Sequence, residues 1–205
     1  MIKNIIFDMG QVLIHWHPTM HISHFELTKQ EQELLIKELF CNIEWPRLDR
    51  GTMSEEEAIA SVNHRLPEKY HPMVEDVITG WWKHPLHPVE GMEEVIRELK
   101  ENGYGIYLLS NAADCLRKYF HRIPGAEYFD ALMVSAEEHY LKPQHEIYET
   151  LFEKFQLKPE ECFFIDDAHY NIEGAYQCGM QGAVFHGDVA ELRYNLKMAG
   201  VQIDA

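Results

Sequence analysis

Cysteine is scarce in this sequence, and its four cysteines are scattered along the chain. They form no CxxC pair, which argues against a disulfide framework and against a zinc site with the usual ligand spacing. Long apolar runs are also missing, since none reaches the length that a membrane-spanning helix needs. The first residues lead into an expected strand and not into a signal peptide. We therefore expect a cytoplasmic protein with no membrane attachment.

Basic residues are few as well. Lysine and arginine number 18 against 34 aspartates and glutamates, which gives a formal net charge of −16. This acidity disfavours nucleic acids and anionic membranes as partners. A small anionic substrate remains possible if local cations and backbone amides hold it. With 205 residues, 46% of them hydrophobic, the chain suits one domain or a core domain with an insertion, and its oligomeric state stays open, a monomer included.

The first and last parts of the sequence carry the pattern of a parallel sheet. An unbroken apolar run in NIIFDMGQVL (4–13) ends at Asp8, as expected of a strand buried on both faces. From residue 88 onward, short apolar runs alternate with amphipathic helices, which predicts an α/β fold with helices on both faces of the sheet. The expected strands are 104–110, 129–135, 161–167 and 181–186, and the expected helices are 89–102, 112–121, 144–156, 169–179 and 188–199.

The segment between these parts is expected to be helical. Thr28 with Glu31, and Ser54 with Glu57, have the spacing of capping boxes and predict helices that begin after Thr28 and Ser54. A third helix is expected over 72–82, and no convincing strand is found. We therefore predict a core domain made of 1–14 and 88–205, with a helical domain inserted at 15–87.

Polar residues stand at the ends of the expected core strands. They are Asp8, Ser110 with Asn111, Lys142, and Asp166 with Asp167. In a parallel sheet these ends meet at one edge, where ligands bind. Each has an ordinary alternative: Asp8 in a solvated turn, Ser110 and Asn111 as helix caps, and Lys142 as an exposed lysine. Two adjacent buried carboxylates are harder to explain without a cation or hydrogen-bond donors.

Taken together, these residue types suit phosphoryl transfer through a covalent intermediate. One carboxylate attacks phosphorus, while further carboxylates hold a divalent cation that offsets the charge of the phosphate. A hydroxyl, backbone amides and a lysine bind the remaining oxygens.

Four motifs resemble those of the haloacid dehalogenase (HAD) superfamily of hydrolases: FDMGQVL (7–13), LLSN (108–111), LKP (141–143) and FFIDDAHYNIEGA (163–175). The inserted helical segment resembles the cap of that superfamily. The likeness is strongest to bacterial sugar phosphatases of the glucose-1-phosphatase type and to the N-terminal phosphatase domain of epoxide hydrolase. The resemblance implies a Rossmann-like core, Mg²⁺ as cofactor and a small phosphorylated metabolite, such as a sugar phosphate, as substrate.

The resemblance also assigns roles to individual residues. It makes Asp8 the nucleophile and gives Mg²⁺ to Asp8, the carbonyl of Gly10 and Asp167, with Asp166 acting directly or through water. Ser110 and the amide of Asn111 would bind the phosphoryl oxygens, and Lys142 would neutralise charge and keep Asp8 ionised. Asn171 would orient the loop of the fourth motif.

One position departs from the usual pattern of the superfamily. Most of its phosphatases have a second Asp two residues after the nucleophile, as general acid and base, and here that residue is Gly10. Loss of such a group typically lowers the rate by about 10²- to 10⁴-fold. Our hypothesis is that the leaving group is a good one, or that water or a cap residue supplies the proton; His15 and His17 are the nearest titratable candidates.

Two other residue types in the inserted segment need an explanation. His15, His17, His21 and His24 are dense, but no carboxylate or cysteine stands among them at ligand spacing, so packing or surface roles are favoured over a transition-metal site. The tryptophans at 16, 45, 81 and 82 are expected mostly in the core of the cap, with one or two lining a pocket.

Two alternative functions remain beside the phosphatase. A metal-free dehalogenase would also lack the second Asp, although the acidic pair at 166–167 would repel a carboxylate substrate. A pseudo-enzyme would bind phosphate and metal without turnover because of Gly10. Dependence on Mg²⁺ and turnover of p-nitrophenyl phosphate separate the three.

Overall fold

A five-stranded parallel sheet forms the centre of the computed structural model, which describes residues 1–204. The strand order is β5-β4-β1-β6-β7, and each neighbouring pair is parallel. The strands are β1 (Asn4–Phe7), β4 (Gly105–Ser110), β5 (Ala131–Val134), β6 (Cys162–Asp166) and β7 (Gln181–Val184). The α/β architecture expected from the sequence is thus confirmed.

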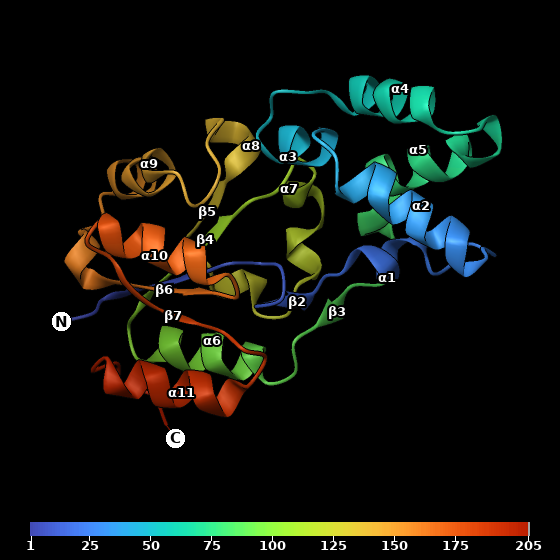
Figure 1. Ribbon diagram of the computed structural model, residues 1–205. Helices are drawn as coiled ribbons and strands as arrows, with labels where there is room; N and C mark the ends of the chain where they lie inside the picture. Colours follow the sequence, from blue (N-terminus) through green and yellow to red (C-terminus); the bar gives the residue numbers. More distant parts are fainter. Residues whose placement is uncertain (205) are drawn as a thin grey trace.

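Side chains of the central strands alternate between two apolar layers. Ile5 and Phe7 of β1 pack into one cluster with α6 (Met92–Glu101), α7 (Leu116–Tyr119) and α11 (Val189–Met198). Ile6 packs into the other with α9 (His145–Phe155) and α10 (His169–Gln177). Figure 1 shows α9 and α10 on one face of the sheet and α6 and α11 on the other. Burial on both faces explains why the strands read as continuous apolar runs.

Three core elements show the largest differences from the sequence prediction. The helix expected at 112–121 is only the short α7, followed by the 3₁₀ turn η3 (Phe120–Arg122). The chain before α7 is not helical at Ala112, whose amide donates to Ser135 Oγ at 2.9 Å. A short helix, α8 (Ser135–Glu138), follows β5 directly. The helix α6 begins three residues later than expected, because Gly91 has a φ of 81° and cannot continue a right-handed helix.

The segment between β1 and α6 is largely helical and has an apolar cluster of its own. It contains α1 (Pro18–Ile22), α2 (Lys29–Phe40), α3 (Glu44–Asp49), α4 (Glu55–Arg65) and α5 (His71–Gly80), with 3₁₀ turns η1 (Glu68–Tyr70) and η2 (Trp81–Lys83). Both capping boxes are confirmed, at Thr28 and Ser54. Leu35, Val62 and Val74 are among the fully buried residues of the cluster. In Figure 1 α1, α2, α4 and α5 lie together apart from the sheet, while α3 lies beside α8.

A small antiparallel ribbon joins this segment to the rest of the chain. It pairs β2 (Ile14–His15) with β3 (His87–Pro88). The sequence prediction of no strand in this segment is therefore wrong at His15 and His87. Strands of two residues carry too little alternation to be recognised, and their pairing depends on contact between positions far apart in the chain. The ribbon lies at the two predicted domain boundaries.

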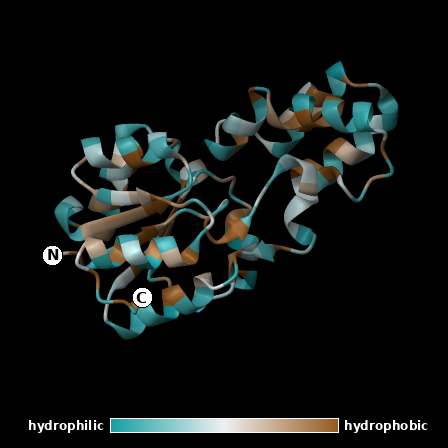
Figure 2. Cartoon of the chain, turned by 60° about the horizontal axis from the view of Figure 1, so that its bottom comes forward, coloured by the Kyte–Doolittle hydropathy of each residue, from teal (hydrophilic) through white to brown (hydrophobic). Residues whose placement is uncertain are grey.

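Apolar side chains gather between the elements. In Figure 2 the strands of the sheet are mostly in the brown of hydrophobic residues, and the helices carry much of the teal of hydrophilic residues. Among residues 1–204, no helix combines the length and the hydropathy that crossing a bilayer requires.

The other short 3₁₀ turns are η4 (Ala126–Tyr128) and η5 (Pro159–Glu161).

Candidate active site

Three neighbouring strands bring the predicted site residues to one edge of the sheet. Phe7 of β1 pairs with Leu108 of β4 on one side and with Ile165 of β6 on the other. Asp8, Ser110 and Asp166 therefore follow or end strands at the same level. Because the strands are parallel, residues about 160 positions apart in sequence meet at this edge.

Lys142 links two of the carboxylates. Its Nζ lies 2.7 Å from Asp8 Oδ1 and 2.7 Å from Asp166 Oδ2, and it donates to the carbonyl of Leu109 at 2.9 Å. The side chain of Lys142 is 1% exposed and that of Asp166 is 0% exposed. An ammonium group has three N–H donors, and here each has a protein acceptor. This geometry favours a lysine that orients Asp8 and keeps it ionised.

Two asparagine side chains hold the loops of the site. Asn111 accepts from the Lys142 amide at 2.8 Å and donates to the Lys142 carbonyl at 3.1 Å, so its side chain fixes the LKP turn. Asn171 donates to both oxygens of Asp166, at 3.0 and 3.1 Å. Asp166 also accepts from the Ala168 amide at 2.8 Å. The side chain of Asn111 is thus engaged by the protein, and its backbone amide is the part left for a ligand.

Asp8, Asp166 and Asp167 form a compact set of oxygen donors. One carboxylate oxygen from each lies within 4.8 Å of the others. Burial raises the pKa of Asp8 to about 7, against the opposing charge of Lys142 and with a smaller contribution from the charge of Asp166. Burial and Asp166 also raise the pKa of Asp167. A divalent cation would lower both pKa values, and carboxylate oxygens are the ligands that Mg²⁺ prefers. The donor set therefore fits Mg²⁺.

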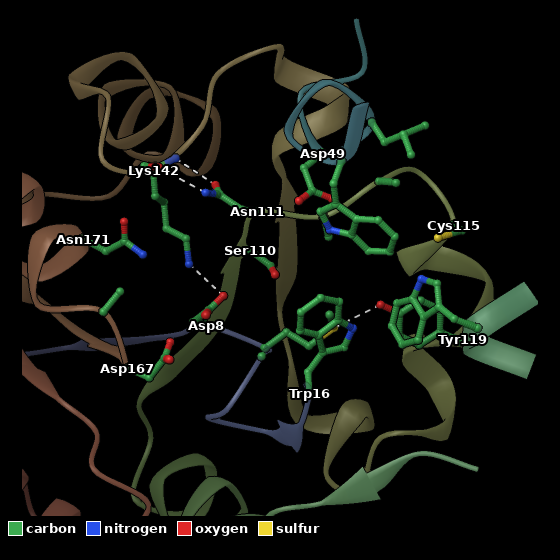
Figure 3. A pocket seen from close by; sticks show the side chains of 18 of the residues that line it. Asp8, Trp16, Asp49, Ser110, Asn111, Cys115, Tyr119, Lys142, Asp167 and Asn171 are labelled. Carbon is green, nitrogen blue, oxygen red and sulfur yellow. Dashed lines mark hydrogen bonds and ion pairs between the residues drawn. The ribbon is translucent and has the colours of Figure 1, made fainter. Parts of the chain in front are cut away.

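A cavity of about 240 Å³ opens over these residues. Of the residues predicted for the site, all but the fully buried Asp166 line it: Asp8, Gly10, Ser110, Asn111, Lys142, Asp167 and Asn171. The opposite wall comes largely from the helical segment and carries Trp16, Trp45 and Trp81. Figure 3 shows Asp8, Lys142 and Asp167 facing this wall across the cavity.

The sequence prediction missed two carboxyl groups that line this cavity, those of Asp49 and Glu55. Asp49, the last residue of α3, lines the wall and points into the space in Figure 3. Burial, with a smaller contribution from the negative charge of Asp8, raises the pKa of Asp49 to about 8. No motif marks Asp49 in the sequence. The two histidines considered as proton donors are placed elsewhere: His15 lies in β2 and His17 caps α1, and neither lines the cavity.

Residues 2–179 match the family of haloacid dehalogenase-like hydrolases. The chain belongs to this family. A sesquiterpene phosphatase of Aspergillus oryzae is 29% identical over 191 residues, which cover 88% of each chain. A glyceraldehyde 3-phosphate phosphatase of Pyrococcus furiosus is 32% identical over 116 residues, or 55% of this chain and 48% of that one.

Solved structures of HAD proteins share the fold of this chain. A HAD-like hydrolase of Porphyromonas gingivalis superposes with a TM-score of 0.73 at 24% identity, over 98% of this chain and 100% of that one. A HAD family enzyme of Bacteroides thetaiotaomicron, solved with magnesium and inorganic phosphate, also has a TM-score of 0.73, at 22% identity over 94% and 99% of the two chains.

Proposed function

We propose that this HAD hydrolase is a Mg²⁺-dependent phosphatase that hydrolyses a small phosphomonoester through an aspartyl-phosphate on Asp8. The observation that carries the proposal is the convergence of Asp8, Asp166 and Asp167 beside the buried Lys142. The phosphatase names of the relatives from Aspergillus oryzae and Pyrococcus furiosus support it.

In this mechanism Asp8 attacks phosphorus and the phosphorus–leaving-group bond breaks. Lys142 holds the attacking carboxylate and favours its ionised form. Ser110 and the Asn111 amide bind the phosphoryl oxygens, which gain charge in the transition state. Water then hydrolyses the acyl-phosphate. Asn171 positions Asp166, and through it Lys142.

Mg²⁺ is assigned to Asp8, Asp167 and the carbonyl of Gly10, with Asp166 acting directly or through water. When bound, the ion supplies positive charge that offsets the phosphate and lowers the barrier to attack by a carboxylate. Asp166 is already engaged by Lys142, Asn171 and the Ala168 amide. The three contacts favour the indirect role for Asp166.

A small substrate suits the cavity. Its volume of about 240 Å³ and its indole-lined wall fit a phosphate ester with one ring or a short apolar chain. We propose a sugar phosphate, whose ring face can lie against Trp16, Trp45 or Trp81. Under the same proposal, residues 15–87 are the cap that selects the substrate, and 1–14 with 88–205 are the catalytic core.

The test is phosphate release from p-nitrophenyl phosphate and from a panel of sugar phosphates and a prenyl monophosphate, with Mg²⁺. Turnover should vanish in Asp8→Asn, should stop with a chelator and should return with added Mg²⁺. Mass spectrometry of acid-quenched enzyme should find one phosphoryl group on the peptide containing Asp8. Full turnover by Asp8→Asn would overturn the covalent route.

The alternative functions give different results in the same experiment. A dehalogenase would release chloride from a 2-chloro acid without Mg²⁺. A pseudo-enzyme would bind phosphate and Mg²⁺ without turning over p-nitrophenyl phosphate, whose leaving group hardly needs an acid.

A further inference from the structure

The leaving group in this reaction needs a proton, and position 10 offers none. A Cβ built on Gly10 would meet only the Cβ of Trp16, at 4.0 Å, so the space beside the nucleophile is open. A side chain that gives this proton has to be another titratable group that lines the cavity. Apart from Asp8, Lys142 and Asp167, these groups are Asp49, Glu55, Cys115, Tyr119 and Tyr170.

Most of these groups are unsuited to the task. Tyr119 donates its hydroxyl to Met9 Sδ at 3.3 Å, and burial raises its pKa well above the usual value. Burial raises the pKa of Cys115 to about 12, so its thiol is a weak acid. Tyr170 is 53% exposed, and Glu55 lies in the first turn of α4, next to a second, more open cavity. Asp49 combines a carboxyl group with a place in the wall facing Asp8.

Contacts to the core fix the position of Asp49. Ser135 directly follows β5, and its Oγ donates to the carbonyl of Asp49. The next residue, Arg50, donates from Nη2 to Gln144 Oε1 at 2.7 Å, and its carbonyl lies 3.0 Å from His139 Nδ1. The end of α3 is therefore seated on the core, beside the turn that carries Lys142. Figure 3 shows the carboxyl of Asp49 entering the cavity from this side.

We propose that Asp49 is the general acid and base of the reaction, in place of the side chain that Gly10 lacks. The inference rests on the proposed phosphatase function. In the first step a bond forms between Asp8 and phosphorus, the bond to the leaving oxygen breaks, and protonated Asp49 gives its proton to that oxygen. In the second step water attacks phosphorus, the bond to Asp8 breaks, and Asp49 takes the proton of the water.

The protonation state of Asp49 agrees with this role. Burial is the main cause that raises its pKa, and it favours the protonated form that a general acid needs. A general acid works best when its pKa lies near the working pH.

The decisive experiment compares Asp49→Asn with wild type on two substrates in Mg²⁺. For an alkyl phosphate, whose leaving group needs a proton, kcat/KM should fall by about 10²- to 10⁴-fold. For p-nitrophenyl phosphate, kcat/KM should change by less than about tenfold, because p-nitrophenolate leaves without help. Its kcat should still fall, with a burst of one p-nitrophenol per active site, since the second step lacks its base.

Rescue and control variants complete the design. Gly10→Asp in the Asp49→Asn background should recover part of kcat/KM for the alkyl phosphate, because a Cβ at position 10 meets no atom closer than 4.0 Å. Asp114→Asn removes an exposed carboxylate outside this cavity and should behave as wild type. Equal losses on both substrates in folded Asp49→Asn, or no loss on either, would overturn the role of Asp49. Failure of wild type on every phosphate ester would instead refute the phosphatase.

A second, independent observation concerns the histidines of the helical segment. His24 Nε2 lies 3.1 Å and His84 Nε2 lies 3.3 Å from the same oxygen, Asp76 Oδ2, and the three donor atoms lie within 4.8 Å of one another. Tetrahedral Zn²⁺ with bonds of about 2.0–2.1 Å separates its ligand atoms by about 3.3 Å. The sequence alone does not indicate this cluster, because Asp76 and His84 are more than 50 positions from His24.

The surroundings of the cluster also suit a cation. A cavity of about 150 Å³ beside it is lined by five imidazoles, those of His15, His21, His24, His84 and His87. The ring of His21 has a buried Nε2 without a hydrogen-bond partner. Imidazole nitrogens with one carboxylate favour zinc or a similar transition metal over Mg²⁺.

We infer that His24, Asp76 and His84 bind a divalent transition-metal ion of the zinc class. The ion would join the turn after α1, the helix α5 and the segment leading to β3. Arg122 of the core donates to the carbonyls of Trp82 and His84. The bound ion would thus stabilise the segment that leads from α5 of the helical segment back to β3 and the core.

Calorimetric titration with Zn²⁺ in excess Mg²⁺ tests this site on the full chain. Wild type should bind one equivalent, with a rise in Tm. His24→Gln and His84→Gln should weaken binding by more than the roughly 10- to 100-fold that losing an outer partner of a metal ligand costs. His186→Gln breaks a comparable pair with Glu191 elsewhere and should bind as wild type. Unchanged binding in His24→Gln and His84→Gln would overturn the inference.

Discussion

At the scale of single residues, Lys142 is the cation that holds the carboxylates of the site together. It is a buried cation between two buried carboxylates, with each of its N–H donors facing a protein oxygen. Removing one partner of a buried ionic group leaves uncompensated charge, which is far more costly than losing an exposed pair. Lys142 therefore supports the fold of this sheet edge as well as the proposed chemistry.

We predict that Lys142→Met lowers the free energy of unfolding by about 3–5 kcal/mol at pH 7.5 without metal. The loss should shrink toward pH 5, because Asp8, whose pKa is already raised, becomes neutral as the pH falls. Urea unfolding at the two pH values measures this. Lys3→Met breaks an exposed pair with Glu161 and should cost at most about 1 kcal/mol. Equal losses for the two variants would contradict the prediction.

At the scale of elements, one buried carboxylate fastens α3 to α4. Glu44 begins α3 with a side chain only 3% exposed. It accepts from Arg65 Nη1 at 2.6 Å and from Ser61 Oγ at 2.6 Å, both on α4. The hydrogen bonds to Arg65 lower the pKa of Glu44 from 4.5 to about 2. Because α3 ends at Asp49, this pairing also helps to position the proposed acid.

We predict that Glu44→Gln destabilises the protein by about 2 kcal/mol at pH 7, the range for hydrogen bonds to charged groups. A carboxyl with a lowered folded pKa stabilises above its unfolded pKa of 4.5, and this contribution is lost as the pH falls toward 2. The difference in the free energy of unfolding between variant and wild type should therefore become smaller between pH 4.5 and 3, as measured by thermal or urea unfolding. Glu75→Gln, an exposed change on α5, should show no such narrowing.

At the scale of the whole molecule, the helical segment meets the core at a close backbone contact. Gly51 has a φ of 66°, and a Cβ there would lie 2.1 Å from the carbonyl oxygen of Ala136 in α8. Only glycine allows this approach, which seats the end of α3 beside the cavity. The placement of Asp49 over Asp8 thus depends on a contact between two segments.

We predict that Gly51→Ala lowers phosphatase kcat/KM by about 10²-fold, the effect of displacing a reacting group by roughly 1 Å. Steady-state kinetics with an alkyl phosphate measures the loss. Gly187→Ala is the matched control: its φ is 83°, but nothing lies within 4 Å of the added Cβ. Gly187→Ala should introduce similar backbone strain and leave kcat/KM for the alkyl phosphate unchanged. Equal activity in the two variants would mean that the contact at Ala136 does not position the site.

Much of this protein could be read from local sequence. Apolar runs that end at Asp8, Ser110 and Asp166 predicted parallel strands, and parallel strands bring their carboxyl ends to one edge whatever lies between them. The capping boxes at Thr28 and Ser54 were equally readable, because each involves a helix end and a residue three positions away. The capping boxes depend only on residues a few positions apart in the sequence. The meeting of the strand ends follows from a general rule of sheet topology.

Only the tertiary structure decided which side chains of the helical segment face the core. Asp49 stands in the cavity because Gly51 and Ser135 seat the end of α3, and no periodicity marks that contact. Asp76 and His84 join His24 only through the packing of α5 and the turn after α1. The sequence by itself determined the strand edge and its carboxylates. The fold determined what lies opposite them, because contacts across 50 to 90 residues depend on how whole segments pack.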